Sequence, residues 1–225
     1  MRRSHSDKAH RRPHVILNAA MTLDGKIATV TGDSKISSNK DLRRVHKLRS
    51  EVDAIMVGIG TMISDNPLLT VRSVRGTNPI RVVIDSVART PPASRIFSAK
   101  DGKTIIAVSK SAPNIRVKRL EDRGAKILRC GHRHVELKSC LSKLYAMGIE
   151  SILLEGGGKL NWSMLEGHLV DEVRITLAPL IAGGEKAVTL AEGLGVRKMS
   201  DAIKLSLRTI QRNKNELVLN YGVAK

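Results

Sequence analysis

Three consecutive glycines, Gly156, Gly157 and Gly158, offer the clearest binding chemistry in this sequence. The apolar residues 151–154 before them are typical of a buried strand, and apolar residues from Leu160 onward recur at the spacing of one helical face. Glycines in a strand-to-helix turn leave N–H groups exposed at a helix N-terminus, which attracts an anion such as a diphosphate. A tight turn without a ligand is the alternative that this stretch alone leaves open.

Two other apolar runs also end in residues that could contact a ligand. Residues 52–58 pass into Gly58-Ile59-Gly60-Thr61, where the hydroxyl could contact a phosphate or a ribose, and residues 80–85 end at Ser86. Each signal is weak on its own. In a parallel sheet, however, the carboxyl ends of the strands lie at one edge, where ligands of α/β proteins collect.

The elements that would position these residues alternate along the chain. Ser38, with Asp41 three residues later, is a typical N-cap for a helix that ends near Ser50 and whose apolar face is Leu42, Val45 and Leu48. The expected strands are 14–21, 52–58, 80–85, 103–108, 125–128, 151–154 and 170–178, and the expected further helices are 115–123, 137–147 and a segment from the glycines to about 167.

This alternation predicts an α/β fold with a mixed, mostly parallel central sheet and helices on both faces. Residues 202–209 and 216–221 are expected to close the sheet as an antiparallel pair around a turn at 212–215. We see no repeat and no interdomain linker. The chain is therefore expected to consist of a basic, disordered tail at residues 1–12, which includes Arg12, and a single domain at residues 13–225.

The formal net charge of +18 favours an anionic partner. Proteins that bind single-stranded nucleic acid stack bases on aromatic side chains, which make up only 2% of this sequence. We therefore expect that the positive electrostatic potential of the protein attracts phosphorylated metabolites. We expect no specific nucleic acid partner. No apolar run approaches the roughly 20 residues that span a bilayer, so a soluble, cytoplasmic protein without a membrane partner is expected.

Candidate metal ligands are sparse. Cys130 and Cys140 cannot form a disulfide framework or a four-thiolate site and are expected to be packed thiols. His132 and His134 lie near Cys130, but no fourth ligand has a convincing spacing, so no metal site is predicted. His46 is expected at the surface of its helix.

Four motifs together resemble a known family, the riboflavin-biosynthesis reductases of dihydrofolate-reductase fold. They are MTLDGK at 21–26, GIGTMISDNPLLTVR at 58–72, VIDS at 83–86 and LEGGG at 154–158. The resemblance covers about residues 14–222 and preserves the order of all four. The complete signature of the zinc deaminase to which bacterial members are fused, a His-x-Glu together with a Cys-x-x-Cys, is absent, because the sequence contains no Cys-x-x-Cys. The chain thus resembles the stand-alone archaeal and fungal type.

The resemblance implies a function. Enzymes of this type reduce 2,5-diamino-6-ribosylaminopyrimidin-4(3H)-one 5′-phosphate to its ribitylamino form with NADPH, with NADH as an alternative. Opening of the ribosylamine ring gives an imine, and hydride transfer to its C1′ carbon completes the reaction. Alternatives are the bacterial-type uracil substrate, dihydrofolate, or a polyanion-binding module that is not an enzyme.

The resemblance also assigns site residues. The NADP set is Ala20, Thr61, Asp65, Ser86, Gly156, Gly157, Gly158 and Lys159, and the substrate set is Ser34, Arg49, Leu69, Arg72 and Glu155. Arg49 and Arg72 could fork onto a phosphate. No general acid is assigned: Asp65 or Glu155 could orient a water as proton donor, and the substrate's own amines are the other candidate source. Read alone, Arg49 could be a solvated helix residue, Asp65 a turn former and Thr61 a cap. Many deaminase-fused members carry a lysine in the first strand where this sequence has Asn18, so a lysine-assisted proton step is not carried over.

A homodimer is the expected assembly. Related riboflavin-pathway reductases form homodimers, and the C-terminal extended segments offer strand edges and faces that a partner could cover. A monomer whose edges are protected by Lys204, Arg208 and Lys214 is the alternative.

Overall fold

The structure is a computed structural model that describes residues 12–98 and 103–224. Its strands are β1 (His14–Thr22), β2 (Ala54–Gly58), β3 (Ile80–Ile84), β4 (Thr104–Val108), β5 (Lys126–Arg129), β6 (Ser151–Gly156), β7 (Glu172–Ala178), β8 (Leu205–Asn213) and β9 (Glu216–Val223). Its helices are α1 (Asn39–Ser50), α2 (Ile59–Asp65), α3 (Asn114–Glu121), α4 (Leu137–Ala146) and α5 (Gly158–Glu166), with two short 3-10 helices, η1 (Arg95–Phe97) and η2 (Met199–Asp201).

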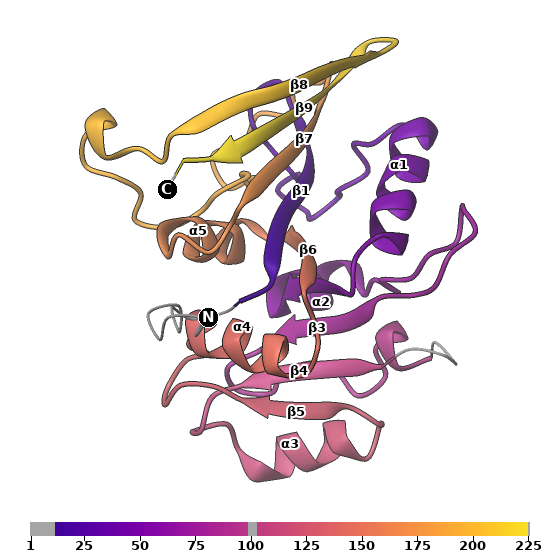
Figure 1. The fold of residues 1–225 in the computed structure, drawn as a ribbon, viewed down its shortest axis with the longest axis vertical. Helices are drawn as coiled ribbons and strands as arrows, with labels where there is room; N and C mark the ends of the chain where they lie inside the picture. Colours follow the sequence, from indigo (N-terminus) through magenta and orange to yellow (C-terminus); the bar gives the residue numbers. More distant parts are fainter. Residues whose placement is uncertain (1–11, 99–102, 225) are drawn as a thin grey trace, which may run out of the picture.

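The described strands form a single sheet in the order β5-β4-β3-β2-β6-β1-β7-β9-β8. Every pair from β5 to β7 is parallel, and β9 is antiparallel to both β7 and β8. Figure 1 shows α4 and α5 on one side of the sheet and α1 and α2 on the other. The predicted fold class is confirmed.

One face of the sheet packs against α4 and α5. Leu17 of β1 and Met56 of β2 belong to a buried cluster with Leu144 of α4 and Met164 of α5, and none of these four side chains is exposed to solvent. Alternate residues of a strand point to opposite faces, so the neighbours of these residues cover the other side.

The opposite face packs against α1, α2 and α3. Val57 of β2 clusters with Met62 of α2 and Leu120 of α3, while Leu153 of β6 clusters with Leu48 of α1. Because both faces are buried, the strands read as continuous apolar runs. This explains why sequence patterns located them well.

Helix α1 begins as predicted but buries a different face. The Ser38 side chain accepts a hydrogen bond from the backbone N–H of Asp41, which confirms the N-cap. Of the predicted apolar face only Leu48 is buried; Leu42 and Val45 line a cavity. The prediction of a surface position for His46 is wrong, since it is only 6% exposed.

The C-terminal pair is confirmed as antiparallel, with a shift in its bounds. β8 begins at Leu205 and extends to Asn213, and Lys214 adopts a positive φ of 54° in the tight turn to β9. The predicted turn at 212–215 was too long because its first residues still pair with β9.

Arg12 corrects part of the tail prediction. Residues 1–11 lie outside the described part of the chain, but Arg12 donates two hydrogen bonds to Asp171, of 2.7 and 2.9 Å. The carboxylate anchors this side chain, so Arg12 is part of the folded domain. In residues 12–98 and 103–224, no helix has the length and apolar character needed to span a bilayer.

Candidate functional site

A cavity of about 520 Å³ opens at the carboxyl edge of the sheet, where β1 separates from β6. The two strands pair in parallel from His14 with Ser151 to Leu17 with Leu154, after which β1 continues alongside β7 only. The predicted site residues that line the cavity are Ala20, Ser34, Arg49, Thr61, Asp65, Leu69, Glu155, Gly156, Gly157, Gly158 and Lys159. The structure therefore brings together eleven positions that are scattered along the sequence.

The glycine turn is confirmed as the connection from β6 to α5. Gly156 and Gly157 have φ values of 76° and 78°, which residues with a side chain rarely adopt. A Cβ at Gly156 would collide with the side chain of Asn161, and one at Gly158 would collide with the carbonyl of Thr189. Two of the three glycines therefore permit close packing, whereas Gly157 faces the cavity near Thr61.

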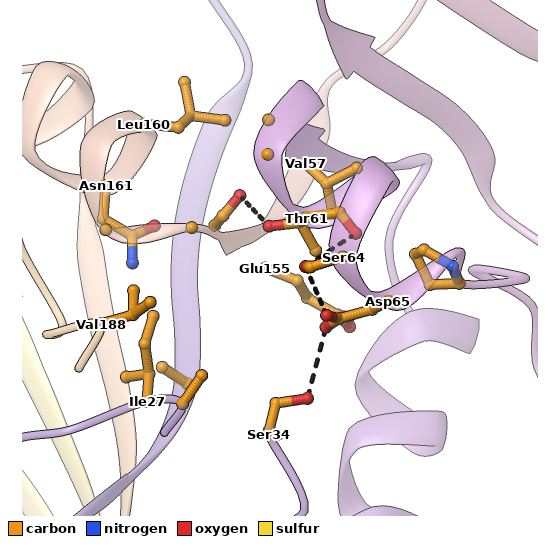
Figure 2. A pocket seen from close by; sticks show the side chains of 18 of the residues that line it. Ile27, Ser34, Val57, Thr61, Ser64, Asp65, Glu155, Leu160, Asn161 and Val188 are labelled. Carbon is orange, nitrogen blue, oxygen red and sulfur yellow. Dashed lines mark hydrogen bonds between the residues drawn. The ribbon is translucent and has the colours of Figure 1, made fainter. Parts of the chain in front are cut away.

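Helix α2 is fixed against this turn by a hydrogen bond from Thr61 Oγ1 to the Gly156 carbonyl, of 3.2 Å. At the other end of α2, Asp65 accepts hydrogen bonds from Ser34, at 3.3 Å, and from Ser64. Figure 2 shows this chain of contacts along one wall of the cavity. Thr61 and Asp65 thus present hydroxyl and carboxylate oxygens to the same space.

Arg49 and Glu155 form a bidentate ion pair. Arg49 Nε and Nη2 donate to the two carboxylate oxygens at 2.8 and 2.6 Å, and Arg49 Nη1 donates to the Thr70 carbonyl at 3.2 Å. Burial alone would lower the pKa of Arg49, but the charge and hydrogen bonds of Glu155 raise it. In this arrangement all three of its nitrogens have partners within the protein. A contact between Arg49 and a phosphate stays a prediction.

A β-bulge positions Glu155. Met56 of β2 pairs with Leu154 of β6, but Val57 pairs with Gly156, so Glu155 is the extra residue. Bulges re-aim a side chain, and this one accompanies the contact of Glu155 with helix α1. No sequence pattern marks the bulge.

Leu69 and Arg72 lie in the segment that follows α2. Leu69 is 2% exposed and has a positive φ of 53°, a strained conformation that is typical of functional sites. Arg72 is exposed and lies outside the cavity lining, where its Nη1 donates to Thr70 Oγ1. Partial desolvation, followed by the charges of Arg49 and Arg95, lowers the pKa of Arg72, so three cations share this end of the site.

His46 is tied to the same segment. Its Nδ1 accepts a hydrogen bond from the backbone N–H of Arg72, at 3.2 Å. Burial, followed by the charges of Arg49 and Arg72, lowers the pKa of His46. Helical periodicity did not reveal this contact because its partner lies in an irregular segment.

Ser86 does not line the cavity. It follows β3, and its hydroxyl accepts a hydrogen bond from the backbone N–H of Val135, at 3.0 Å. The side chain thus fixes the segment before α4 to the carboxyl edge of the sheet.

A polar network beneath α1 was missed by the sequence analysis. Arg44 donates to Asp41 at 2.8 Å, to Asn18 at 3.0 Å and to Thr176 at 3.1 Å. Asn18 lines the cavity, and Asp41 and Thr176 are buried. The sequence offered one signal for this network, namely the spacing of three residues between Asp41 and Arg44, which places both on the same face of a helix.

The cysteines are buried, as predicted, and both are free thiols. A hydrogen bond between them lowers the pKa of Cys130 and raises that of Cys140. Across the described residues, no group of three or more His, Cys, Asp or Glu side chains could hold a metal ion.

The mixed sheet and the glycine-lined cavity at its carboxyl edge define a small-molecule-binding α/β protein. Sequence comparison identifies the family. The RibD C-terminal domain matches residues 13–219, so the chain belongs to the RibD C-terminal domain family. The resemblance inferred from the four motifs is confirmed.

Two archaeal relatives are named 2,5-diamino-6-ribosylamino-4(3H)-pyrimidinone 5′-phosphate reductase. The protein from Methanothermobacter thermautotrophicus is 54% identical over 215 residues, which cover 94% of this chain and 99% of the relative. The protein from Archaeoglobus fulgidus is 40% identical over 193 residues, which cover 81% of this chain and 87% of the relative. Both similarities cover more than four fifths of each chain.

Solved structures agree with the fold. A Thermotoga maritima deaminase and 5-amino-6-(5-phosphoribosylamino)uracil reductase is 29% identical with a TM-score of 0.79, and the match covers 95% of this chain and 57% of that one. The riboflavin biosynthesis reductase Rib7 of Saccharomyces cerevisiae is 22% identical with a TM-score of 0.73, over 95% of this chain and 90% of Rib7. At this identity, the likeness to Rib7 shows the fold alone.

Proposed function

We propose that this protein reduces the ribosyl side chain of 2,5-diamino-6-ribosylaminopyrimidin-4(3H)-one 5′-phosphate to the ribitylamino form, using NADPH. The observation that carries the proposal is the 54% identity over nearly the whole length of both chains to an archaeal protein named for this reaction. The cavity supports it, because eleven of the thirteen residues assigned by resemblance to the cofactor or substrate, all except Ser86 and Arg72, converge there.

The glycine turn fits the diphosphate of a dinucleotide. A Cβ at Gly157 would lie 3.0 Å from Thr61 Oγ1 and would narrow the gap between α2 and α5. The first turn of α5 contains no acidic side chain, so its N–H groups and dipole favour an anion, and Lys159 adds a positive charge. Ala20, Thr61, Asp65, Ser86 and the residues from Gly156 to Lys159 are the proposed cofactor contacts.

The opposite part of the cavity fits the pyrimidine substrate. Glu155 can accept hydrogen bonds from amino groups or sugar hydroxyls, and Arg49 holds its carboxylate in one orientation. Ser34 and Leu69 line the same space, and the exposed Arg72 is the arginine that can bind a 5′-phosphate at its mouth.

Bound NADPH would supply the hydride for C1′ of the substrate. The contribution of the protein is to hold the reactants together, to restrict water and to use the distant phosphate as a binding handle. Asp65, oriented by Ser34 and Ser64, and Glu155 are the proposed residues for orienting a water molecule that donates the proton.

We also propose that the protein is a homodimer that buries β8. This edge strand is exposed along almost its whole length, and Leu205, Leu207 and Ile210 are exposed by 44%, 51% and 57%. An exposed edge strand with large apolar side chains is a surface that a second copy can cover.

Product mass tests the proposed reaction. The purified protein is incubated with NADPH and either the diamino substrate or the corresponding uracil compound. A gain of two hydrogens in the diamino compound supports the proposal. A gain only in the uracil compound would assign the bacterial-type substrate, and oxidation of NADPH with dihydrofolate alone would assign a different reductase.

A further inference from the structure

A second cavity, of about 320 Å³, lies between helix α3 and the segment that follows strand β3. It is lined by three arginines, one threonine and two small apolar residues, namely Ala88, Arg89, Thr90, Pro92, Arg116 and Arg119. None of these residues lines the cavity at the carboxyl edge of the sheet. The second cavity is therefore a separate place on the molecule, and the reduction proposed above does not use it.

The three guanidinium groups have no partners in the folded chain. Within residues 12–98 and 103–224, no hydrogen bond or ion pair joins any of these side chains to another group, and no described acidic residue lines the cavity. Arg116 and Arg119 are three positions apart on α3, a spacing at which like charges repel each other. Concentrated positive charge without a counter-charge attracts an anion from solution.

The walls of this cavity are fixed by the fold. Thr90 donates through its backbone N–H and its hydroxyl to one carboxylate oxygen of Asp85, at 2.7 and 2.8 Å, and both residues are buried. Ala88 has a positive φ of 54° and belongs to the same buried cluster as Val117 of α3. The turn that carries Arg89 and the helix that carries the other two arginines are thus held together, so binding requires little ordering of the backbone.

The chemistry of the lining selects phosphate groups. Each guanidinium presents a planar set of N–H donors that matches two oxygens of a phosphate, and it has no acceptor atom. One phosphate group carries about two negative charges at pH 7, so it cannot balance three guanidiniums, whereas a chain of two or three phosphates can. The volume is near the lower end of the range for small-molecule sites, which suits a phosphate chain better than a whole dinucleotide.

We propose that Arg89, Arg116 and Arg119 form a second anion-binding site, which takes a chain of two or more phosphate groups such as inorganic tripolyphosphate or the triphosphate of a nucleotide. These arginines bind the ligand and take no part in the reduction. The ligand neutralises the repulsion among them, so its binding should raise the unfolding midpoint. The assignment does not depend on the proposed function.

Calorimetric titration with tripolyphosphate, with and without saturating NADPH, tests this site. Arg116→Gln combined with Arg119→Gln removes two of the three guanidiniums and should weaken binding about tenfold or more. Lys118→Gln combined with Lys126→Gln is the matched control, because it removes the same charge from exposed residues of α3 and β5 that do not line the cavity. The control should bind tripolyphosphate like the wild type, and neither double variant should change kcat/KM for the diamino substrate.

Adenosine triphosphate is the second probe. Similar affinities for the two probes support recognition of the phosphate chain, whereas much tighter binding of the nucleotide would assign the cavity to the base and overturn the proposed ligand class.

Three other results would overturn the site itself. Equal weakening in both double variants would reduce the binding to a diffuse attraction by the net charge of +18. Binding that disappears when NADPH is saturating would assign the three arginines to the cofactor. Absence of binding to the wild type, or unchanged affinity in the arginine variant, would show that these arginines hold no phosphate chain.

Discussion

Arg49 and Glu155, 106 positions apart in the sequence, close the substrate side of the cavity through two hydrogen bonds of 2.8 and 2.6 Å. Their side chains are only 12% and 14% exposed. Because the pair is nearly buried, removing one partner would leave the other charge unpaired in a place with little water, which destabilises the folded state. The pair therefore connects the stability of the fold to the geometry of the site.

Breaking this pair should separate stability from activity. Arg49→Met leaves Glu155 without its partner and should cost on the order of 3 kcal/mol of unfolding free energy. Arg49→Met combined with Glu155→Gln should regain most of that stability, because no buried charge is left alone, but not the activity. Urea unfolding and steady-state kinetics measure the two effects. A double variant with near wild-type kcat/KM would contradict the role of Glu155.

Gly157→Ala should weaken NADPH binding about tenfold or more, because the added Cβ intrudes beside Thr61 and the φ of 78° disfavours a side chain. Gly148→Ala is the matched control. Gly148 has a φ of 85° and open space around its Cβ position, so this variant carries backbone strain away from the cavity. Cofactor fluorescence titration measures binding, and equal affinities for the two variants would argue against a diphosphate at the turn.

Arg72→Ala should raise KM for the phosphorylated substrate about tenfold or more and leave the dephosphorylated substrate nearly unaffected. The reason is that Arg49 is committed to Glu155, whereas Arg72 is exposed and faces repulsion from Arg49 and Arg95 that an anion would relieve. Arg75→Ala changes a second exposed arginine of the same segment and should have little effect. An equal loss for both substrates would place the phosphate elsewhere.

His46 should make stability depend on pH. Its pKa lies below the ordinary 6.5, first because of burial and then because of Arg49 and Arg72. The unfolded chain therefore takes up the proton first, so the stabilisation is complete above about pH 6.5 and is lost as the pH falls toward the lowered value. His46→Asn keeps an acceptor for the Arg72 N–H and should flatten this dependence. Unfolding curves at several pH values provide the test, and an unchanged slope would exclude His46 as the source.

Leu207→Lys combined with Ile210→Lys should yield a monomer, since two charges on β8 cannot be buried against a second copy without large desolvation. Ile115→Lys is the control, because Ile115 of α3 is 67% exposed and lies at the other end of the sheet. Light scattering reports the mass. A wild-type mass near the 24.6 kDa of a single chain would refute the dimer.

Local patterns predicted most of the fold. Ser38 and Asp41 marked the start of α1, and the glycines marked the end of β6, because capping and turn chemistry act over a few residues. The strands that are buried on both faces appeared as short apolar runs. For these elements, the residues that cause the local structure are neighbours in the sequence, so a sequence pattern can reveal them.

The site was harder to predict because its contacts are long-range. No residue close to Arg49 in the sequence indicates that its guanidinium binds Glu155. Likewise, no residue close to His46 in the sequence indicates that its ring accepts a hydrogen bond from the Arg72 backbone. The apolar residues Leu42 and Val45 had the spacing of a core face, yet they line the cavity. The resemblance to a family grouped most of the site residues, whereas the network of Arg44 and Asn18 required the structure.

Transfer of deuterium from NADPH that is labelled at C4 of the nicotinamide is the sharpest test of the proposed hydride transfer. The protein is incubated with the diamino substrate and each of the two labelled stereoisomers, and the product is examined by mass spectrometry and NMR. One of the two stereoisomers is expected to deliver a single deuterium to C1′ of the ribityl chain. Product without the label, or a label on the pyrimidine ring, would contradict it.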